Sequence, residues 1–228
     1  MKLTLSDPKY LRETISIISE LVNETNLKVT PDGIELVAMD PANVSMAILK
    51  ILSSSFVEYD VDKEVNLAIN LNSLKQILRR SKPNETLTLE LGKDGKLKIQ
   101  LKGTNTRTFS LPIIDTEQKE QKIPNLEFPL SIEADASLVD EAIEDASLVS
   151  ESVILIAEPK KFTIEASGDT SDARIEMAQG EGTKIKMESG KVSAKYSIEY
   201  MKKITKGSKL ADKVEIRFNK DYPLKVTY

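Results

Sequence analysis

Apolar and polar positions alternate along most of this chain, and a few short stretches with helical spacing interrupt the alternation. Residues 8–23 place Leu11, Ile15, Ile18 and Val22 three or four positions apart, which predicts a helix. A second helix is predicted over residues 72–81. The N-terminal residues 1–7 enter a strand pattern, and further strands are expected over residues 26–30, 34–39, 44–49, 65–70, 86–91, 97–101 and 106–111.

The second half of the chain has the same kind of pattern. Helices are predicted over residues 137–147 and 198–206. Strands are expected over residues 153–157, 161–166, 173–178, 183–187, 193–197, 213–219 and 224–228. Because the strands alternate cleanly, each sheet should have one buried face, with the helices packed on one side. The fold class is therefore α+β with antiparallel sheets.

The two halves resemble each other at an offset of 127 residues. Residues 74–82 match 201–209 and residues 86–91 match 213–218, while residues 21–25 match 148–152 at the same offset. Chance similarity of amphipathic helices is the alternative. The sequence thus predicts two similar domains, over residues 1–115 and 128–228. The polar segment 116–127 between them reads as an exposed connecting loop.

Composition narrows the chemistry that this chain could perform. Its 228 residues include no cysteine and no histidine, which removes thiolate nucleophiles, catalytic triads and the commonest metal ligands. No stretch approaches the ~20 apolar residues of a membrane helix, and no signal peptide is apparent. A binding or scaffold protein of the cytoplasm is favoured, with no catalytic residue, metal or cofactor.

Positive charge gathers on the second helix of each half, although the net charge is −4. Lys75, Arg79 and Lys82 share one helical face, and Lys202, Lys206 and Lys209 repeat the spacing. A solvated face is the simpler reading of one such run. Its repetition favours an anionic partner, and the scarcity of aromatic residues favours non-specific contact with duplex DNA phosphates.

The first helices differ in charge. Lys9 and Arg12 make the first one modestly positive, whereas residues 135–151 carry six acidic side chains and no basic one. A solvated acidic face is a simpler interpretation than a metal site, because hard cations usually need ligands from several segments.

Five segments together resemble the proliferating cell nuclear antigen family of DNA sliding clamps, especially its archaeal branch. They are VTPDGIELVAMDP at residues 29–41 with Val44 after it, NLNSLKQILR at 70–79, TRTFSLPIID at 106–115, DASLVSE at 145–151 and YPL at 222–224. They occur in order and span almost the whole chain. The resemblance implies a processivity factor in which three chains close a ring around duplex DNA, with short helices lining the hole and sheets outside.

The resemblance also implies partners and residue roles. DNA polymerase, the clamp loader and other clients would dock short peptides, and the protein would act at the nucleoid of an archaeal-type cell. The DNA-facing residues would be Lys9, Arg12, Lys75, Arg79, Arg80, Lys82, Lys202, Lys203, Lys206 and Lys209. The client-peptide pocket would comprise Met39, Val44, Met46, Ile123, Pro124, Phe128 and Pro223. The subunit interface would pair Arg107, Thr108, Phe109, Ser110 and Leu111 with Arg174, Ile175, Glu176, Met177 and Ala178 of the next chain.

Two departures from the family pattern open alternatives. Glu141 and Glu144 stand where DNA would pass, and the chain stops at Tyr228, before the final strand and tail expected from the resemblance. A specialised subunit of a hetero-oligomeric ring, acting mainly as a protein scaffold, is the main alternative. An enzyme that uses Asp140 and Glu144 as paired carboxylates is a remote one, since no nucleophile or cofactor motif accompanies them.

Overall fold

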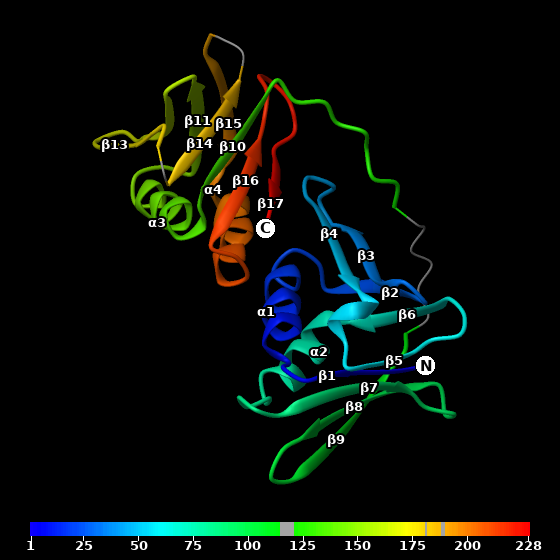
Figure 1. The fold of residues 1–228 in the computed structure, drawn as a ribbon. Helices are drawn as coiled ribbons and strands as arrows, with labels where there is room; N and C mark the ends of the chain where they lie inside the picture. Colours follow the sequence, from blue (N-terminus) through cyan, green and yellow to red (C-terminus); the bar gives the residue numbers. More distant parts are fainter. Residues whose placement is uncertain (115–120, 181, 188–189) are drawn as a thin grey trace. The chain divides into compact units, whose positions relative to one another are not determined.

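The chain folds into two compact units, Met1–Pro124 and Asn125–Tyr228, in a computed structural model (Figure 1). The structure describes residues 1–114, 121–180, 182–187 and 190–228. The boundary between the units falls inside the predicted connector, of which residues 116–120 lie outside the described residues. In the described ranges no helix is long and apolar enough to cross a membrane.

The first unit contains two antiparallel sheets and two short helices. One sheet has the strand order β5-β1-β7-β8-β9 and the other the order β4-β3-β2-β6. The helices are α1 (Lys9–Ile18) and α2 (Leu71–Leu78). The strands are β1 (Lys2–Leu5), β2 (Glu24–Thr30), β3 (Gly33–Met39), β4 (Met46–Leu52), β5 (Glu58–Asp60), β6 (Val65–Asn70), β7 (Thr86–Leu91), β8 (Lys96–Lys102) and β9 (Thr106–Pro112).

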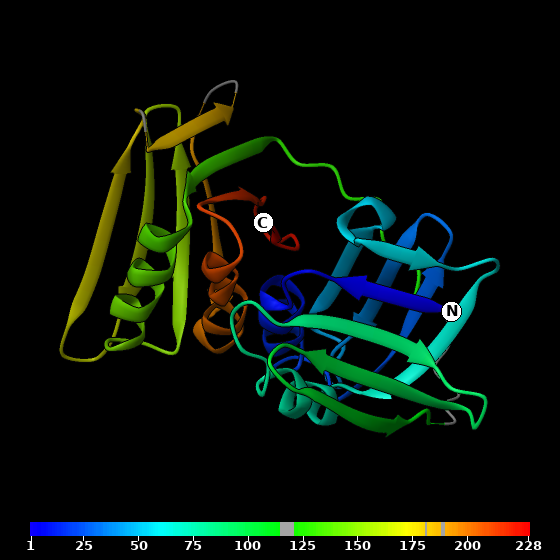
Figure 2. The same cartoon turned by 60° about the horizontal axis from the view of Figure 1, so that its bottom comes forward.

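The second unit repeats this plan with the strand orders β14-β10-β16-β17 and β13-β12-β11-β15. Both of its helices, α3 (Ala136–Ser147) and α4 (Ile198–Thr205), lie on one face of the second of these sheets (Figure 2). The strands are β10 (Leu130–Asp135), β11 (Ser152–Glu158), β12 (Lys161–Ser167), β13 (Asp172–Ala178), β14 (Thr183–Met187), β15 (Val192–Ser197), β16 (Lys213–Arg217) and β17 (Lys225–Thr227).

The strand orders confirm the predicted duplication. The sheet β4-β3-β2-β6 corresponds to β13-β12-β11-β15, and α2 corresponds to α4 at the predicted offset of 127. The match of residues 21–25 with 148–152 is wrong by one residue, however. Thr25 pairs with Ile69 as Val153 pairs with Tyr196, so the first helix and the strand after it follow an offset of 128. At β4 the strand pairing gives an offset of 126, because the loop between β3 and β4 is two residues longer than the loop between β12 and β13.

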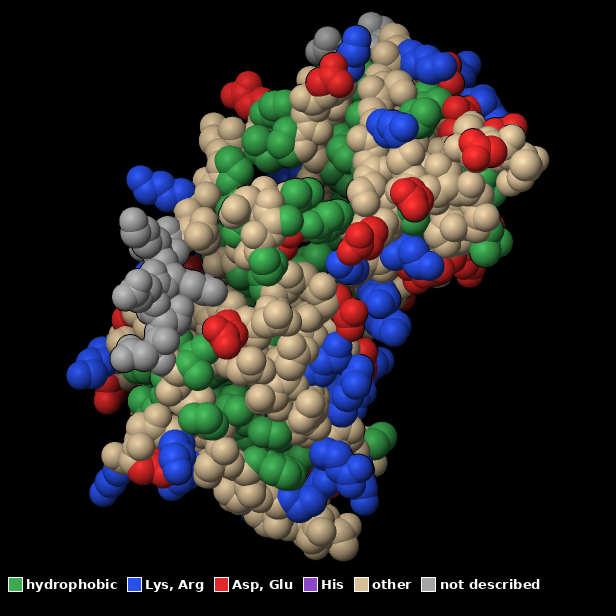
Figure 3. All heavy atoms as spheres, turned by 180° about the vertical axis from the view of Figure 1, so that it is seen from behind, with side chains coloured by type: hydrophobic (Ala, Val, Ile, Leu, Met, Phe, Trp, Pro, Cys, Tyr) green, Lys and Arg blue, Asp and Glu red, His purple; other side chains and the backbone are tan. Residues whose placement is uncertain are grey.

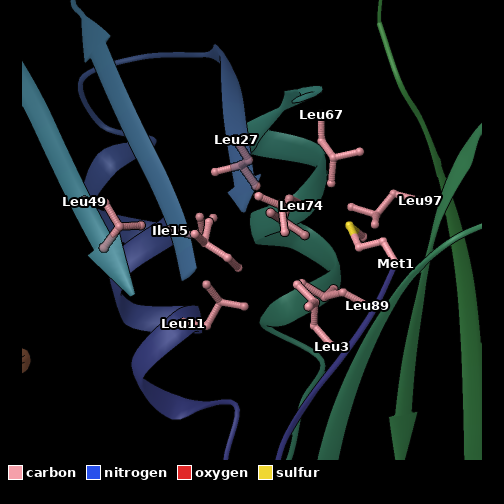
Figure 4. A pocket seen from close by; sticks show the side chains of 12 residues that line it. Met1, Leu3, Leu11, Ile15, Leu27, Leu49, Leu67, Leu74, Leu89 and Leu97 are labelled. Atoms are coloured by element: carbon pink, nitrogen blue, oxygen red, sulfur yellow. The ribbon is translucent and has the colours of Figure 1, made fainter. Parts of the chain in front are cut away.

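Each unit has its own aliphatic core. In the first unit, side chains from α1, α2 and both sheets converge on one point, among them Leu3, Ile15, Leu74 and Leu97 (Figure 4). The space left between these side chains is only about 10 Å³. A void of that size holds at most one water molecule, so the convergence is core packing and offers no ligand site.

The predicted elements need two main corrections. Strand β4 begins at Met46 and not at Val44, because the side chain of Asp40 holds residues 42–45 in a closed loop. The short strand β5 and the strand β10 were not predicted. Three residues are too few to display an alternating pattern, whereas the alternation of β10 is present in the sequence and could have been recognised.

Candidate functional site

A basic turn follows the second helix of the first unit. Asn70 caps α2 by accepting a hydrogen bond from the Ser73 backbone N–H at 2.9 Å. Leu71, Leu74 and Leu78 then turn one helical face into the core. The chain therefore leaves the helix with Arg79, Arg80 and Lys82 exposed to solvent.

A buried carboxylate holds this turn in place. Glu85 accepts hydrogen bonds from the Lys82 backbone N–H at 2.8 Å and from the Arg107 guanidinium at 2.6 and 2.8 Å. Arg107 also donates to the Arg80 carbonyl oxygen at 3.0 Å. The hydrogen bond from Lys82, followed by those from Arg107, lowers the pKa of Glu85. Arg107, predicted for the subunit interface, therefore directs its side chain into its own unit.

Two of the predicted DNA-facing lysines form ion pairs with another segment of their own unit. Lys75 is 2.7 Å from the Glu20 carboxylate, and only 11% of its side chain is exposed. Lys202, at the equivalent position of α4, is 2.7 Å from Glu144 on α3 and donates to the Ser147 hydroxyl at 3.2 Å. Lys75 thus joins α2 to the turn after α1, and Lys202 joins α4 to α3, which makes each lysine less available to a phosphate than its sequence position suggests.

The remaining basic residues fall into two groups. Arg12 is half-buried, with Nε 3.1 Å from Glu13 and Nη1 donating to the Ser81 hydroxyl at 3.3 Å. Lys203 pairs with Glu199 at 2.7 Å. By contrast, the described residues supply no ion-pair partner to a second group of cations: Lys9, Arg79, Arg80, Lys82, Lys206 and Lys209.

The acidic helix α3 directs its carboxylates outward. Glu144 pairs with Lys202, Asp140 accepts a hydrogen bond from the Ser208 hydroxyl at 3.1 Å, and Glu141 is exposed. The two carboxylates considered as a catalytic pair are thus each engaged with a different residue. No group of three or more acidic side chains that could hold a metal ion occurs within the described part of the chain.

Lys and Arg side chains gather on one flank of the first unit (Figure 3). The turn beyond α2 contributes some of these cations, and hydrogen bonds between its backbone and the side chains of Glu85 and Arg107 fix its position. The basic side chains of the turn form no ion pair with the described residues. A positioned row of cations suits contact with a phosphate backbone and has no means of reading base sequence.

The predicted client pocket draws on both units, and each part is described separately. In the first unit, Met39 and Met46 stand opposite each other in the β3–β4 ladder, and the loop between them exposes 67% of Val44. Ile123 and Pro124 are exposed at the end of this unit.

In the second unit, the Phe128 ring meets the Tyr222 ring edge-on at 5.6 Å, and Pro223 next to it is exposed. The Tyr222 carbonyl oxygen accepts a hydrogen bond from the Tyr196 hydroxyl at 3.1 Å. An open hollow of about 430 Å³ lies beside Phe128.

The two strands predicted for subunit contact are both sheet edges. β9 ends one sheet of the first unit and β13 ends one sheet of the second. On β9, Thr108 and Ser110 are exposed, Phe109 is half-buried and Leu111 is buried. On β13, Ile175 and Met177 turn inward and Ala178 is exposed, while Arg174 pairs with Glu165 and Glu176. An edge strand leaves one row of backbone groups without a partner in its sheet, which is what strand pairing between chains requires.

Comparisons with known proteins agree with this architecture. The family model for the proliferating cell nuclear antigen N-terminal domain matches residues 1–121, and that for the C-terminal domain matches residues 122–228. The chain belongs to the proliferating cell nuclear antigen family. The resemblance inferred from the five sequence segments is therefore confirmed, as is the two-domain α+β fold with antiparallel sheets and few short helices.

Two relatives of this family member, both from archaea, are named DNA polymerase sliding clamps. The DNA polymerase sliding clamp of Pyrococcus abyssi is 38% identical over 222 residues, covering 96% of this chain and 89% of the relative. The DNA polymerase sliding clamp of Nanoarchaeum equitans is 34% identical over 233 residues, covering 100% and 93%.

Solved structures give the same result. The crystal structure of PCNA from Thermococcus kodakaraensis has a TM-score of 0.94 at 28% identity, covering 100% of this chain and 93% of that one. The PCNA2–PCNA3 complex of Sulfolobus tokodaii has a TM-score of 0.90 at 28% identity, with the same coverage.

Sequence reasoning missed the residues that position these sites in this family member. Asp40 and Glu85 are nearly fully buried acids that hold a loop and a turn through backbone N–H groups. Each is flanked by turn-forming residues, Pro41 after Asp40 and Asn84 before Glu85, which was the available signal. A carboxylate beside a turn residue is often exposed, however, so burial had to come from the structure.

Proposed function

We propose that this chain serves as a DNA polymerase sliding clamp, three copies of which close a ring around duplex DNA and hold polymerase on it. The observation that carries this proposal is the repeated basic turn after the second helix of each unit. Its cations, Arg79, Arg80 and Lys82 in one unit and Lys206 and Lys209 in the other, have no ion-pair partner among the described residues. The names of the archaeal relatives support the same function.

In this proposal the contacts with DNA are electrostatic and independent of sequence. Lysine and arginine side chains neutralise phosphates and release condensed counterions. A closed ring is held by topology, so each contact can be weak and the clamp can slide. The chain then holds enzymes at the chromosome and performs no chemistry itself. This division of labour suits a protein with neither histidine nor cysteine.

Ring closure would join the edge strand β9 of one chain to the edge strand β13 of the next. Exposed Thr108 and Ser110 on β9 are compatible with a neighbouring strand. Clients would dock at the pocket predicted from Met39, Val44 and Met46 together with Ile123, Pro124, Phe128 and Pro223. The exposed Val44 side chain supports a docking role because it stands in the loop between the half-buried pair Met39 and Met46, and contiguous apolar surface, unlike a single exposed residue, marks a binding site.

The test is reversal of charge at the two basic turns. In the double variant Arg79→Glu and Lys206→Glu, we expect the length of DNA synthesised per binding event on primed circular DNA to fall several-fold. The dependence of clamp–DNA binding on salt concentration should become weaker, because fewer phosphates are contacted. The matched control, Lys98→Glu with Lys195→Glu, makes the same net change at exposed strand positions. Equal synthesis by the wild type and the Arg79/Lys206 variant would contradict the proposed contact.

A hetero-oligomeric ring is the second candidate. It is favoured by the acidic α3 and by the likeness to a complex of two different clamp subunits. Native mass spectrometry distinguishes the two candidates. Three copies in the absence of other chains support the homotrimer. A monomer that assembles only with related subunits from the same host supports the second candidate.

A further inference from the structure

The outer face of the β3–β4 hairpin carries an apolar strip that continues beyond the predicted client pocket. We define the apolar strip as Val37, Met39, Val44, Met46 and Ile48. Met39 is opposite Met46 and Val37 is opposite Ile48 in the ladder, so two successive cross-strand pairs on one face are apolar. Ile48 is 52% exposed, while the positions that alternate with Val37 and Met39 along β3, Leu36 and Ala38, face the core and are buried.

The equivalent face of the second unit shows that a clamp sheet does not need such a strip. There, Glu165 and Arg174 replace the Val37–Ile48 pair, and Ser167 and Asp172 replace the Met39–Met46 pair. Glu165 and Arg174 also form an ion pair. The same hairpin is thus charged on one unit and apolar on the other, and among the described residues none of the five strip side chains belongs to the hydrophobic core of its unit or packs against it.

The loop that joins the two strands is built to hold Val44 in place. Asp40 is 5% exposed, and its Oδ1 accepts from the backbone N–H groups of Val44 at 2.7 Å and Ser45 at 2.6 Å. Its Oδ2 accepts from the Ala42 N–H at 3.2 Å. Residues 40–45 form this loop, whereas the corresponding loop of the second unit, residues 168–171, is two residues shorter.

The loop backbone also contains one residue in the left-handed region. Asn43 adopts a φ of 57°, in the left-handed region. Asn tolerates this conformation better than most residues do. The left-handed residue reverses the chain so that the next side chain, Val44, projects outward with 67% of its surface exposed.

The size and borders of the strip indicate what occupies it. Glu35 and Lys50, 3.0 Å apart, form the next pair along the ladder and end the apolar face. Five side chains cover far less than the about 800 Å² per partner of a stable interface between globular proteins. The occupant is therefore a short apolar segment of a client protein and not a second copy of this chain.

We propose that the client-binding surface extends along the β3–β4 ladder to Val37 and Ile48, and that Asp40 is the positioning residue that fixes Val44 at its end. This inference rests on the proposed function, since it assumes that clients dock at Val44. It adds two contact residues and one positioning residue to that surface.

The experiment measures binding of the DNA polymerase of Pyrococcus abyssi, in the absence of DNA, to immobilised full-length clamp. Ile48→Arg introduces the residue found at the equivalent position of the second unit, and a charge in an apolar contact should weaken binding about tenfold. Leu52→Arg is the matched control, because Leu52 is on the same strand and 54% exposed but lies beyond the Glu35–Lys50 pair. We expect it to bind like the wild type.

Val44→Glu separates failure of this inference from failure of the proposed function. If Val44→Glu weakens binding and Ile48→Arg does not, the extension of the surface is wrong and the client site stands. If neither variant weakens binding, the client site itself is wrong. Equal weakening by Ile48→Arg and Leu52→Arg would also overturn the extension, because the effect would then be one of added charge.

The role of Asp40 has its own readout. Asp40→Asn retains an oxygen that can accept the N–H groups of Val44 and Ser45, whereas Asp40→Ala retains none. We expect Asp40→Ala to lose both polymerase affinity and hydrogen-exchange protection at those two amides, and Asp40→Asn to recover most of both. Loss of protection in Asp40→Ala with full affinity would contradict a positioning role.

Discussion

Ser81 and Ser208 occupy the same position in the turn after the second helix of their units, yet their hydroxyls meet opposite charges. Ser81 accepts a hydrogen bond from Arg12 at 3.3 Å, and Ser208 donates one to Asp140 at 3.1 Å. Arg12 and Asp140 are themselves equivalent positions on the first helix. A hydroxyl can accept or donate, so the fold accommodates either charge at this place without rearrangement.

The charge difference extends over the whole helical layer. In the first unit, residues 9–20 and 71–82 carry six basic and two acidic side chains. In the second, residues 137–148 and 198–209 carry four basic and five acidic side chains. An ion-paired lysine on the second helix is retained in both units, as Lys75 and Lys202. Duplication has thus kept the framework and changed the surface, and we infer that the first unit provides most of the attraction for phosphate.

The largest effect expected from this comparison concerns the core under the second helix. Leu78 is fully buried, whereas Thr205 at the equivalent position is buried with a hydroxyl that finds no hydrogen-bond partner among the described residues. Leu78→Thr removes apolar contacts and buries a hydroxyl, so the free energy of unfolding should fall by about 2–5 kcal/mol. Urea denaturation followed by circular dichroism measures the change.

A substitution at the equivalent position of the second unit is the matched control. Thr205→Val removes the unpartnered hydroxyl with little change of shape and should raise the free energy of unfolding by about 1 kcal/mol. If Thr205→Val is destabilising, the hydroxyl has a partner in solution and the comparison between the two positions fails.

A second, smaller effect concerns the acidic helix. Glu141 is exposed on α3, and replacing it with lysine makes the second unit resemble the first in charge. We expect Glu141→Lys to increase retention on DNA several-fold at low salt and to steepen the dependence of log K on log salt by about 0.9 for each new phosphate contact. Asp169→Lys, in an exposed loop between β12 and β13, is the control of equal charge change. Equal gains from both variants would show that net charge alone is responsible.

Much of this organisation could be read from the sequence, and the residues show why the rest could not. Apolar spacing placed α2 and the repeated Lys-rich faces, because side-chain periodicity directly reports which face is buried. It could not show that Lys75 reaches Glu20 in the turn after α1, or that Lys202 reaches Glu144 on α3, since both contacts depend on how the two helices of a unit pack. The one-residue error in the register of Leu21 and Leu148 has the same origin. Equivalent residues are identified by the pairing partners of their strands, which sequence similarity alone does not show.

The smallest expected effect concerns pH and two tyrosines. Tyr59 donates to the Thr30 carbonyl oxygen at 2.6 Å in the first unit, and Tyr196 donates to the Tyr222 carbonyl oxygen at 3.1 Å in the second. Burial raises the pKa of both hydroxyls, that of Tyr196 to about 12. Since the raised pKa favours the neutral form in the folded state, the associated stability is complete below the unfolded pKa of about 10. It is lost as the pH rises toward 12.

Thermal unfolding between pH 9 and pH 12 measures this loss, and the comparison between the units sharpens it. Tyr196→Phe removes a hydroxyl group whose pKa burial raises to about 12, so the melting temperature of this variant should depend less on pH in this window than that of the wild type. Tyr59→Phe should flatten the profile less, because Tyr59 is the less buried of the two hydroxyl groups. An equal or larger flattening by Tyr59→Phe would show that burial in the second unit does not dominate the alkaline titration.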